Sequence, residues 1–163
     1  MNPLADHPDF TIKTGSNGRL SEDFLKRYPK IPEDYNIFLK SFLLLTNLSD
    51  TTWFNSISDF NDSHTESEFS WNEFEQQSLA AFEGDETTRN QIISFWNAHL
   101  PFILSVKNSY AYFSIGTADN NFGKIYFGEE PEYEETDHVA DSFSEFLEAL
   151  KNKTLEERYL NLF

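Results

Sequence analysis

Apolar and polar positions alternate along the last third of the chain. Between Tyr110 and Ile115 the residues alternate Tyr, Ala, Tyr, Phe, Ser, Ile, and the same two-residue period returns at residues 125–127. This period is typical of a strand with two different faces, and Tyr, Phe and Ile suit such a pleated setting. Residues 117–123 between the two runs are rich in Asp, Asn and Gly, which tolerate turn geometry. The pattern predicts two strands joined as a hairpin by a long loop.

A helical period follows the hairpin. Ser142 and Glu145 form the Ser-x-x-Glu pattern of a capping box, in which the two side chains satisfy free N–H groups at the start of a helix. Apolar residues then recur at helical spacing, namely Phe143, Phe146, Leu147 and Leu150. The sequence therefore predicts a helix that begins at Ser142 and buries one apolar stripe against the neighbouring sheet.

Other signals divide the earlier part of the chain. They predict helices near residues 21–28, 32–42, 71–82 and 88–100, a short helix after Lys151, strands near residues 51–54 and 102–106, and a polar loop over residues 61–67. The three leucines at 43–45 fit either a helix end or a strand, and residues 1–19 are expected to form a loosely structured N-terminal arm. This order favours one α+β domain over residues 20–163, with a mixed, mostly antiparallel sheet and helices packed on one side.

The composition predicts a globular domain with a Phe-rich core. Hydrophobic residues make up 39% of the 163 residues, and 17 residues are Phe. Cys is absent, which excludes disulfides and thiolate metal sites. The start of the chain is polar and no apolar run approaches the length of a membrane span. We therefore expect a soluble, cytoplasmic protein that does not contact a membrane.

Negative charge is large and unevenly spread. The formal net charge is −16, and residues 41–88 and 128–148 contain no Lys or Arg. A field of this sign repels nucleic acid and anionic membranes and speeds encounter with a basic partner. Taken alone, the charge is explained more simply by solubility than by a specific partner.

Residues 128–137, GEEPEYEETD, are the best candidate for a binding site. Tyr133 stands there among six acids, which are Glu129, Glu130, Glu132, Glu134, Glu135 and Asp137. A carboxylate array with an aromatic anchor suits a basic cleft on a partner protein. A solvated acidic loop without a partner explains the same residues equally well. Phe122, in the polar turn of the hairpin, is a second candidate anchor, and it can equally fold back onto the hairpin.

Patterns that carry catalysis or metal binding do not stand out. The four histidines, His7, His64, His99 and His138, lack metal-ligand spacing, and neither a Gly-x-Ser-x-Gly elbow nor a glycine-rich phosphate loop occurs. His99 closes an apolar helical stripe and is expected at the edge of the core, whereas His138 is expected in a solvated loop. We therefore expect no enzyme, no cofactor and no metal. A pocket for a small ligand or substrate near the tryptophans Trp53, Trp71 or Trp96 stays open as an alternative.

Three segments resemble the SUKH superfamily, which includes bacterial immunity proteins and yeast regulators of cell-wall assembly and killer-toxin resistance. Residues 31–39, IPEDYNIFL, are similar to its LP-x-D/E-Y-x-x-F-L helix. Residues 113–127 are similar to its F-x-I-G-x-D-G-x-G-D-x-I-x-F hairpin, and residues 139–147, VADSFSEFL, to its V-A-x-S-F-x-E-F-L segment. The chain departs from the family at residues 40–43, where the usual Asn-Gly turn is replaced by KSFL, and at residues 120–124, where glycines and an acid are replaced by NNFGK.

The resemblance implies a single α+β domain and two alternative functions. For bacterial members it implies an immunity protein that binds a cognate polymorphic toxin, often a nuclease, and neutralises it by occlusion. For the yeast relatives it implies a regulatory interaction scaffold of cell-wall or stress pathways, without a toxin partner. The family motifs present here look structural and contact surfaces vary with the toxin, so the resemblance carries over no binding residue.

Overall fold

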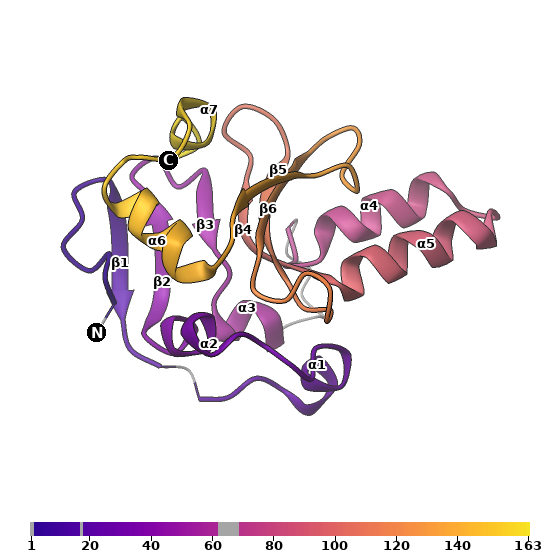
Figure 1. The fold of residues 1–163 in the computed structure, drawn as a ribbon, viewed down its shortest axis with the longest axis horizontal. Coiled ribbons are helices and arrows are strands. Elements are labelled where there is room, and N and C mark those ends of the chain that lie inside the picture. Colours follow the sequence, from indigo (N-terminus) through magenta and orange to yellow (C-terminus); the bar gives the residue numbers. More distant parts are fainter. Residues whose placement is uncertain (1, 17, 62–68) are drawn as a thin grey trace.

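The computed structural model describes residues 2–16, 18–61 and 69–163 of the chain. Within these ranges seven strands form one sheet, in which each strand pairs antiparallel with the next one along the chain (Figure 1). The strands are β1 (Phe10–Thr14), β2 (Phe42–Asn47), β3 (Thr52–Phe54), β4 (His99–Ser105), β5 (Ala111–Gly116), β6 (Ile125–Glu129) and β7 (Asp137–Ala140). The predicted α+β fold is confirmed, and the described strand pairs are all antiparallel rather than mixed.

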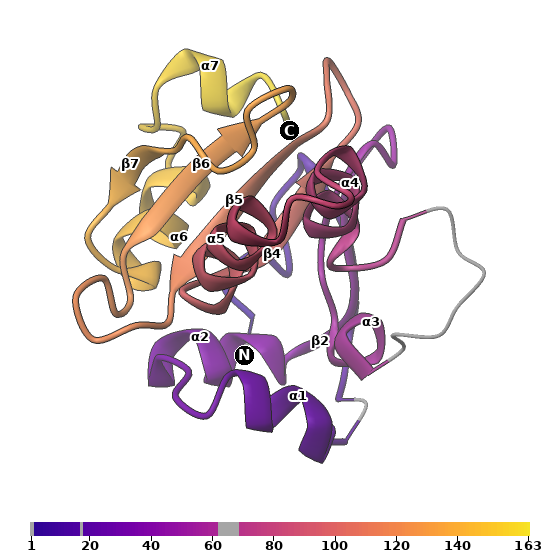
Figure 2. The same cartoon turned by 90° about the vertical axis from the view of Figure 1, so that its right-hand side faces the viewer.

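Helices lie on both faces of this sheet. They are α1 (Glu22–Arg27), α2 (Glu33–Leu39), α3 (Ile57–Asn61), α4 (Glu73–Ala81), α5 (Glu86–Asn97), α6 (Phe143–Lys151) and α7 (Glu157–Leu160). Figure 2 shows α4 and α5 in front of strands β4 to β6, with α6 on the far side of the same strands. In Figure 1 the α4–α5 pair projects away from the body of the molecule.

The first core lies on the face that α6 covers. Alternate residues of β5 point into it, and the ring of Phe113 lies 5.2 Å from that of Phe146 on α6. The helix begins as predicted, because the Ser142 hydroxyl oxygen accepts a hydrogen bond from the Glu145 N–H at 3.1 Å. The Glu145 carboxylate in turn accepts one from the Asp141 N–H at 3.2 Å. The capping box predicted from the sequence is therefore present in the structure.

The second core lies on the opposite face, under α4 and α5. Leu104 of β4 and Tyr112 of β5 are fully buried against Phe74 of α4 and Ile92 and Trp96 of α5. The ring centroids of Trp96 and Tyr112 are 4.9 Å apart. The predicted placement of helices on one side therefore holds for α6 and not for α4 and α5. The reason is that β4 and β5 present large apolar rings or chains on both faces, and each face must be covered.

The three segments that carry the family resemblance meet in the first core. Tyr35 of α2 lies 5.2 Å, ring to ring, from Phe143 of α6. The Asp34 carboxylate of α2 accepts hydrogen bonds from the Ser144 N–H at 3.1 Å and the Ser144 hydroxyl at 2.8 Å. The hairpin of β5 and β6 joins them through Phe113. These motif residues therefore stabilise the fold.

Several boundaries differ from the prediction. Residues predicted as a loose arm include strand β1, which pairs with β2, and Leu4, which is fully buried. The leucines at 43–45 belong to β2, so the preceding helix ends at Leu39, and α5 ends at Asn97 before strand β4. Strand β7 was not predicted. Asn61 ends α3, and residues 62–67 of the predicted polar loop lie outside the described residues.

Candidate protein-binding site

The predicted acidic segment connects β6 to β7. Glu129 ends β6, Asp137 begins β7, and residues 130–136 cross between the two strands. The exposed carboxylates of the segment are Glu129, Glu130, Glu132, Glu135 and Asp137. The Asp137 carboxylate already pairs with Arg158, whose Nη1 lies 3.0 Å from it. The other four form no ion pair with a described residue, and they remain available to a partner.

Tyr133 is not the exposed anchor that the sequence suggested. Its side chain is buried, and its ring stacks on that of Phe74 with centroids 4.7 Å apart and planes 12° apart. The Tyr133 hydroxyl donates a hydrogen bond to Oε1 of Gln77 at 2.7 Å. The prediction is wrong because a ring on α4, remote in sequence, provides an apolar partner for this tyrosine. Tyr133 therefore packs the β6–β7 connection against the second core.

Tyr112 of β5 also fixes the position of the acidic connection, from the side of the sheet. The Tyr112 hydroxyl donates a hydrogen bond to the backbone carbonyl of Tyr133. It passes so near Gly128 that a Cβ on this residue would lie 2.5 Å from the Tyr112 hydroxyl oxygen. Only glycine leaves enough room for this contact. The position of the acidic connection is therefore set by a buried tyrosine and a glycine.

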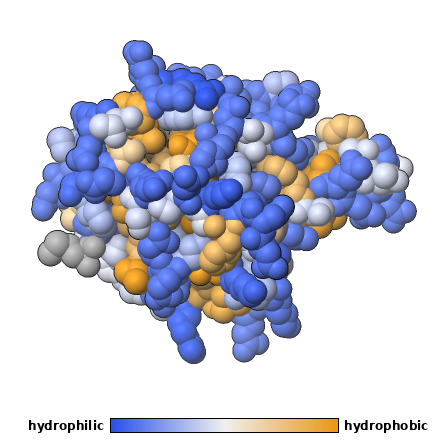
Figure 3. Space-filling model, in the orientation of Figure 1, coloured by the Kyte–Doolittle hydropathy of each residue, from blue (hydrophilic) through white to orange (hydrophobic). Residues whose placement is uncertain are grey.

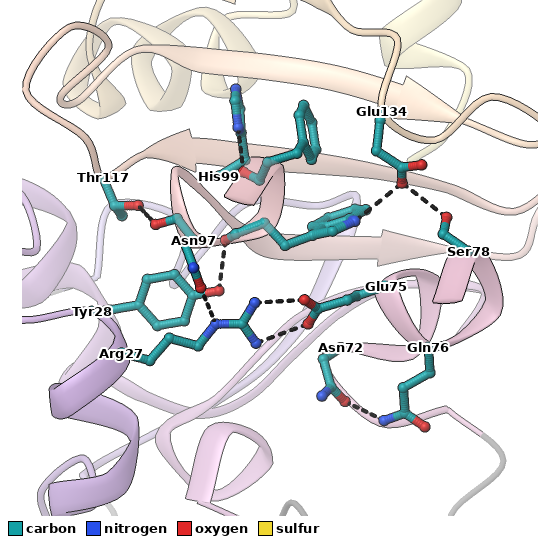
Figure 4. A network of polar contacts seen from close by, with 12 residues as sticks. Arg27, Tyr28, Asn72, Glu75, Gln76, Ser78, Asn97, His99, Thr117 and Glu134 are labelled. Atoms are coloured by element: carbon teal, nitrogen blue, oxygen red, sulfur yellow. Dashed lines mark hydrogen bonds and ion pairs between the residues drawn. The ribbon is translucent and has the colours of Figure 1, made fainter. Parts of the chain in front are cut away.

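Glu134 is the one acid of the segment that turns inward. Its Oε2 accepts hydrogen bonds from the Ser78 hydroxyl at 2.9 Å and from Trp96 Nε1 at 3.1 Å, as Figure 4 shows. Its Oε1 makes no hydrogen bond to a described residue. Half-burial raises the pKa of Glu134, because desolvation penalises the charged form more than the two hydrogen bonds favour it.

A groove opens between α4 and the acidic connection. Its volume is about 500 Å³, and it is lined by Gln77, Ser78, Ala81, Phe82, Glu130, Pro131, Glu132, Tyr133 and Glu134. Phe82, just past the end of α4, is 44% exposed. A smaller hollow of about 240 Å³ lies along the same connection and shares Glu130, Pro131 and Glu132 with the groove. The exposed acids of the segment therefore stand around two hollows rather than on a flat surface.

The sequence did not point to the α4 side of this groove. Phe82 was included in a predicted helix, and nothing in the local pattern shows that its ring is exposed. The one available signal was an aromatic residue directly before the acidic turn Glu83-Gly84-Asp85. Neither Ser78 nor Trp96 was expected to bind an acid, because their pairing with Glu134 joins segments distant in the sequence.

An ion pair fastens the α4–α5 pair to the rest of the domain. Arg27 of α1 contacts both carboxylate oxygens of Glu75 on α4, at 2.8 and 2.6 Å, and its Nε donates to Oδ1 of Asn97 at 2.8 Å (Figure 4). The Tyr28 hydroxyl donates to the backbone carbonyl of Trp96 at 2.8 Å. One end of the groove wall is thereby anchored to α1.

Phe122 lies elsewhere. It is 45% exposed in the connection that precedes β6, whereas the acidic segment follows β6. The two candidate contact regions are therefore at opposite ends of one strand. The structure does not bring Phe122 together with the acidic segment.

The other candidates from the sequence are dispersed. His99 packs on Phe95 with ring centroids 4.0 Å apart, and burial lowers its pKa. His138 lies in β7 rather than in a loop, and its Nε2 is 3.0 Å from the Asp141 carboxylate. His7 bonds the Lys151 carbonyl at 3.1 Å, and His64 lies outside the described residues. Over the described ranges, no group of three or more His, Asp and Glu side chains is placed to hold a metal ion.

The three tryptophans do not share one pocket wall. Trp71 is buried in the first core and Trp96 in the second. Trp53 is half-buried and lines a hollow of about 280 Å³ beside β2 and α3. Of the three alternative positions for a small-ligand pocket, Trp53 therefore borders a hollow, whereas Trp71 and Trp96 are buried in the cores.

Comparison of the chain with protein-family models, with curated proteins and with solved structures gives no match. Among the described residues, no helix combines the length and the apolar character needed to cross a lipid bilayer. What the site can do is therefore judged from its own geometry.

Proposed function

We propose that the protein is an immunity-type inhibitor that binds a basic partner protein, a cognate toxin, and blocks it by occlusion. The observation that carries this proposal is the set of four exposed carboxylates without an ion-pair partner in the described structure, which line the groove with its apolar wall or the smaller hollow beside it. Like charges held close together repel one another, and a basic surface relieves that repulsion. The same field steers a basic partner toward the groove. The proposed place of action is the cytoplasm.

Two further features support this reading. Figure 3 shows hydrophobic atoms among hydrophilic ones over the projecting α4–α5 pair, and contacts that exclude water need such a mixture. The resemblance to immunity proteins concerns α2, the β5–β6 hairpin and α6, whose motif residues pack in the first core. The groove is built from other segments, so its chemistry is free to suit one particular toxin.

The test is affinity capture of the tagged protein from its own cells, with washes at low and high salt and mass spectrometry of the retained proteins. We expect one dominant partner with a basic domain. The activity of that partner should then fall in proportion to added inhibitor and reach zero near a one-to-one ratio. A spread of weak partners, or a partner whose activity is unaffected, would contradict the inhibitor reading and favour a regulatory scaffold.

A pair of charge variants makes the test specific for the proposed surface. The first variant neutralises the four acids of the segment that form no ion pair with a described residue, with the substitutions E129Q, E130Q, E132Q and E135Q. The control removes four exposed acids from other parts of the surface, with the substitutions D6N, E22Q, E33Q and D50N. Both have the same net charge. We expect the first variant alone to slow association by about tenfold or more at low salt, because steering depends on local charge. An equal effect of both variants would mean that only the net charge matters.

A further inference from the structure

Glu134 occupies an unusual place in the groove. It is the half-buried acid of the segment, held by Ser78 and Trp96 through one carboxylate oxygen only. The second oxygen has no hydrogen bond to a described residue. A carboxylate accepts hydrogen bonds at both oxygens, and this second oxygen still reaches solvent, so an occupant of the groove can bond to it. Glu134 thus presents one open hydrogen-bond acceptor and a negative charge to the groove.

The walls of the groove restrict what can satisfy this charge. Phe82, Ala81 and Pro131 supply apolar surface, and Glu130 and Glu132 add negative charge at the exposed rim. An anion is excluded by this charge, and an apolar group would cover the Glu134 carboxylate without giving it a hydrogen-bond partner. The occupant that fits is a long side chain with an apolar stem and a cationic end.

We propose that the groove receives one arginine side chain of the protein partner, with its guanidinium on the Glu134 carboxylate and its stem along Phe82 and Pro131. This inference rests on the proposed function and names the chemistry by which the same site recognises its partner. Arginine suits the site better than lysine because a guanidinium is planar, more weakly hydrated and able to lie on an aromatic ring. The guanidinium has five N–H donors, so some of them can bond the Glu134 carboxylate while the others bond water or the acids at the rim.

The indole of Trp96 is a built-in reporter of this binding. Its N–H donates to the Glu134 carboxylate, so its resonance in a ¹H–¹⁵N spectrum should move when a cation binds there. The probes are the tripeptides acetyl-Gly-Arg-Gly-amide, its neutral citrulline analogue and its lysine analogue. We expect a saturable shift of the Trp96 signal with the arginine peptide, no saturable shift with citrulline, and binding about threefold or more weaker with lysine.

Variants of the intact protein identify the site. E134Q keeps an acceptor for Trp96 and Ser78 but removes the charge, and it should abolish the saturable shift. F82A changes an exposed wall residue, so it leaves the fold intact and should weaken binding of the arginine peptide. E22Q, an exposed acid on α1, makes the same change in net charge and should bind normally. A Trp96 signal that stays still, or that responds equally to citrulline or in E134Q, overturns the inference.

The outcome is separable from that of the proposed function. If the peptide fails to bind while capture still yields an inhibited partner sensitive to the acidic variants, the arginine assignment is wrong and the function stands. If the arginine peptide binds at Glu134 and no partner is inhibited, the groove is real and the inhibitor reading is wrong.

Discussion

The ion pair between Arg27 and Glu75 offers a quantitative test of how the groove wall is held. The side chain of Glu75 is 6% exposed, whereas that of Arg27 is 26% exposed. Losing Arg27 therefore leaves a buried carboxylate without a cation, and losing Glu75 leaves a guanidinium that still reaches solvent and Asn97. Breaking a buried pair from one side costs about 3–5 kcal/mol. We place R27M at the lower end, about 3 kcal/mol, and E75M nearer 1–2 kcal/mol, because Arg27 is only partly buried.

The assay is urea unfolding of R27M, E75M and the double variant R27M/E75M. With a denaturant slope of about 2 kcal/mol per molar, R27M should lower the midpoint by about 1.5 M. In a thermal scan the same loss corresponds to about 6–12 °C. The double variant should be more stable than R27M alone, because it no longer buries an unpaired charge.

Two results would refute this reasoning. If R27M loses less than about 1 kcal/mol, water reaches Glu75 and the pair does not anchor α4. If the losses of the single variants simply add in the double variant, the two side chains act independently and the bidentate geometry is without energetic consequence.

Three shorter predictions follow from the site. G128A should lose about 1–3 kcal/mol in urea unfolding, because a methyl group there overlaps the Tyr112 hydroxyl; unchanged stability would contradict that contact. Because burial raises the pKa of Glu134, its folded-state advantage is present below the ordinary Glu pKa and is lost as the pH rises through the raised value. E134Q should therefore gain stability relative to wild type across that window in urea unfolding measured from about pH 4 to 7, and a pH-independent difference would refute the shift. F122A should leave partner affinity unchanged in a titration, because Phe122 lies at the other end of β6; a loss above about tenfold would reassign the contact surface.

Local signals in the sequence predicted the elements whose stabilising contacts are themselves local. The helix beginning at Ser142 has its cap within four residues, and the β5–β6 hairpin pairs neighbours along the chain. Strand β1 was missed because its polar alternation, Phe10 to Thr14, forms a strand only when β2 lies beside it. Helices α4 and α5 were predicted, but their position on the second face was not, because it depends on contacts of Tyr112 with Phe74 and Trp96, which are distant in the sequence.

The candidate site was predicted in outline but not in its working parts. The concentration of acids in residues 128–137 is visible in the sequence, and most of these acids are exposed. The roles of Tyr133 and Glu134 could not be predicted, since each depends on a residue of α4 or α5 that is distant along the chain. Contacts with such residues bury Tyr133, which therefore supports the connection instead of contacting a partner, and turn Glu134 inward so that it lines the groove.

The order of the strands has a consequence for how this surface can change. Strand β3 pairs directly with β4, and β6 pairs directly with β7. The chain between β3 and β4 and the chain between β6 and β7 are therefore connections whose residues take no part in the strand pairing. Both walls of the groove belong to these connections. Residues 79–88 at the tip of the α4–α5 pair and residues 130–132 can therefore be exchanged between homologous scaffolds without altering a strand pairing. The residues that contact a partner can therefore vary between related domains while the strand pairing of the sheet stays the same.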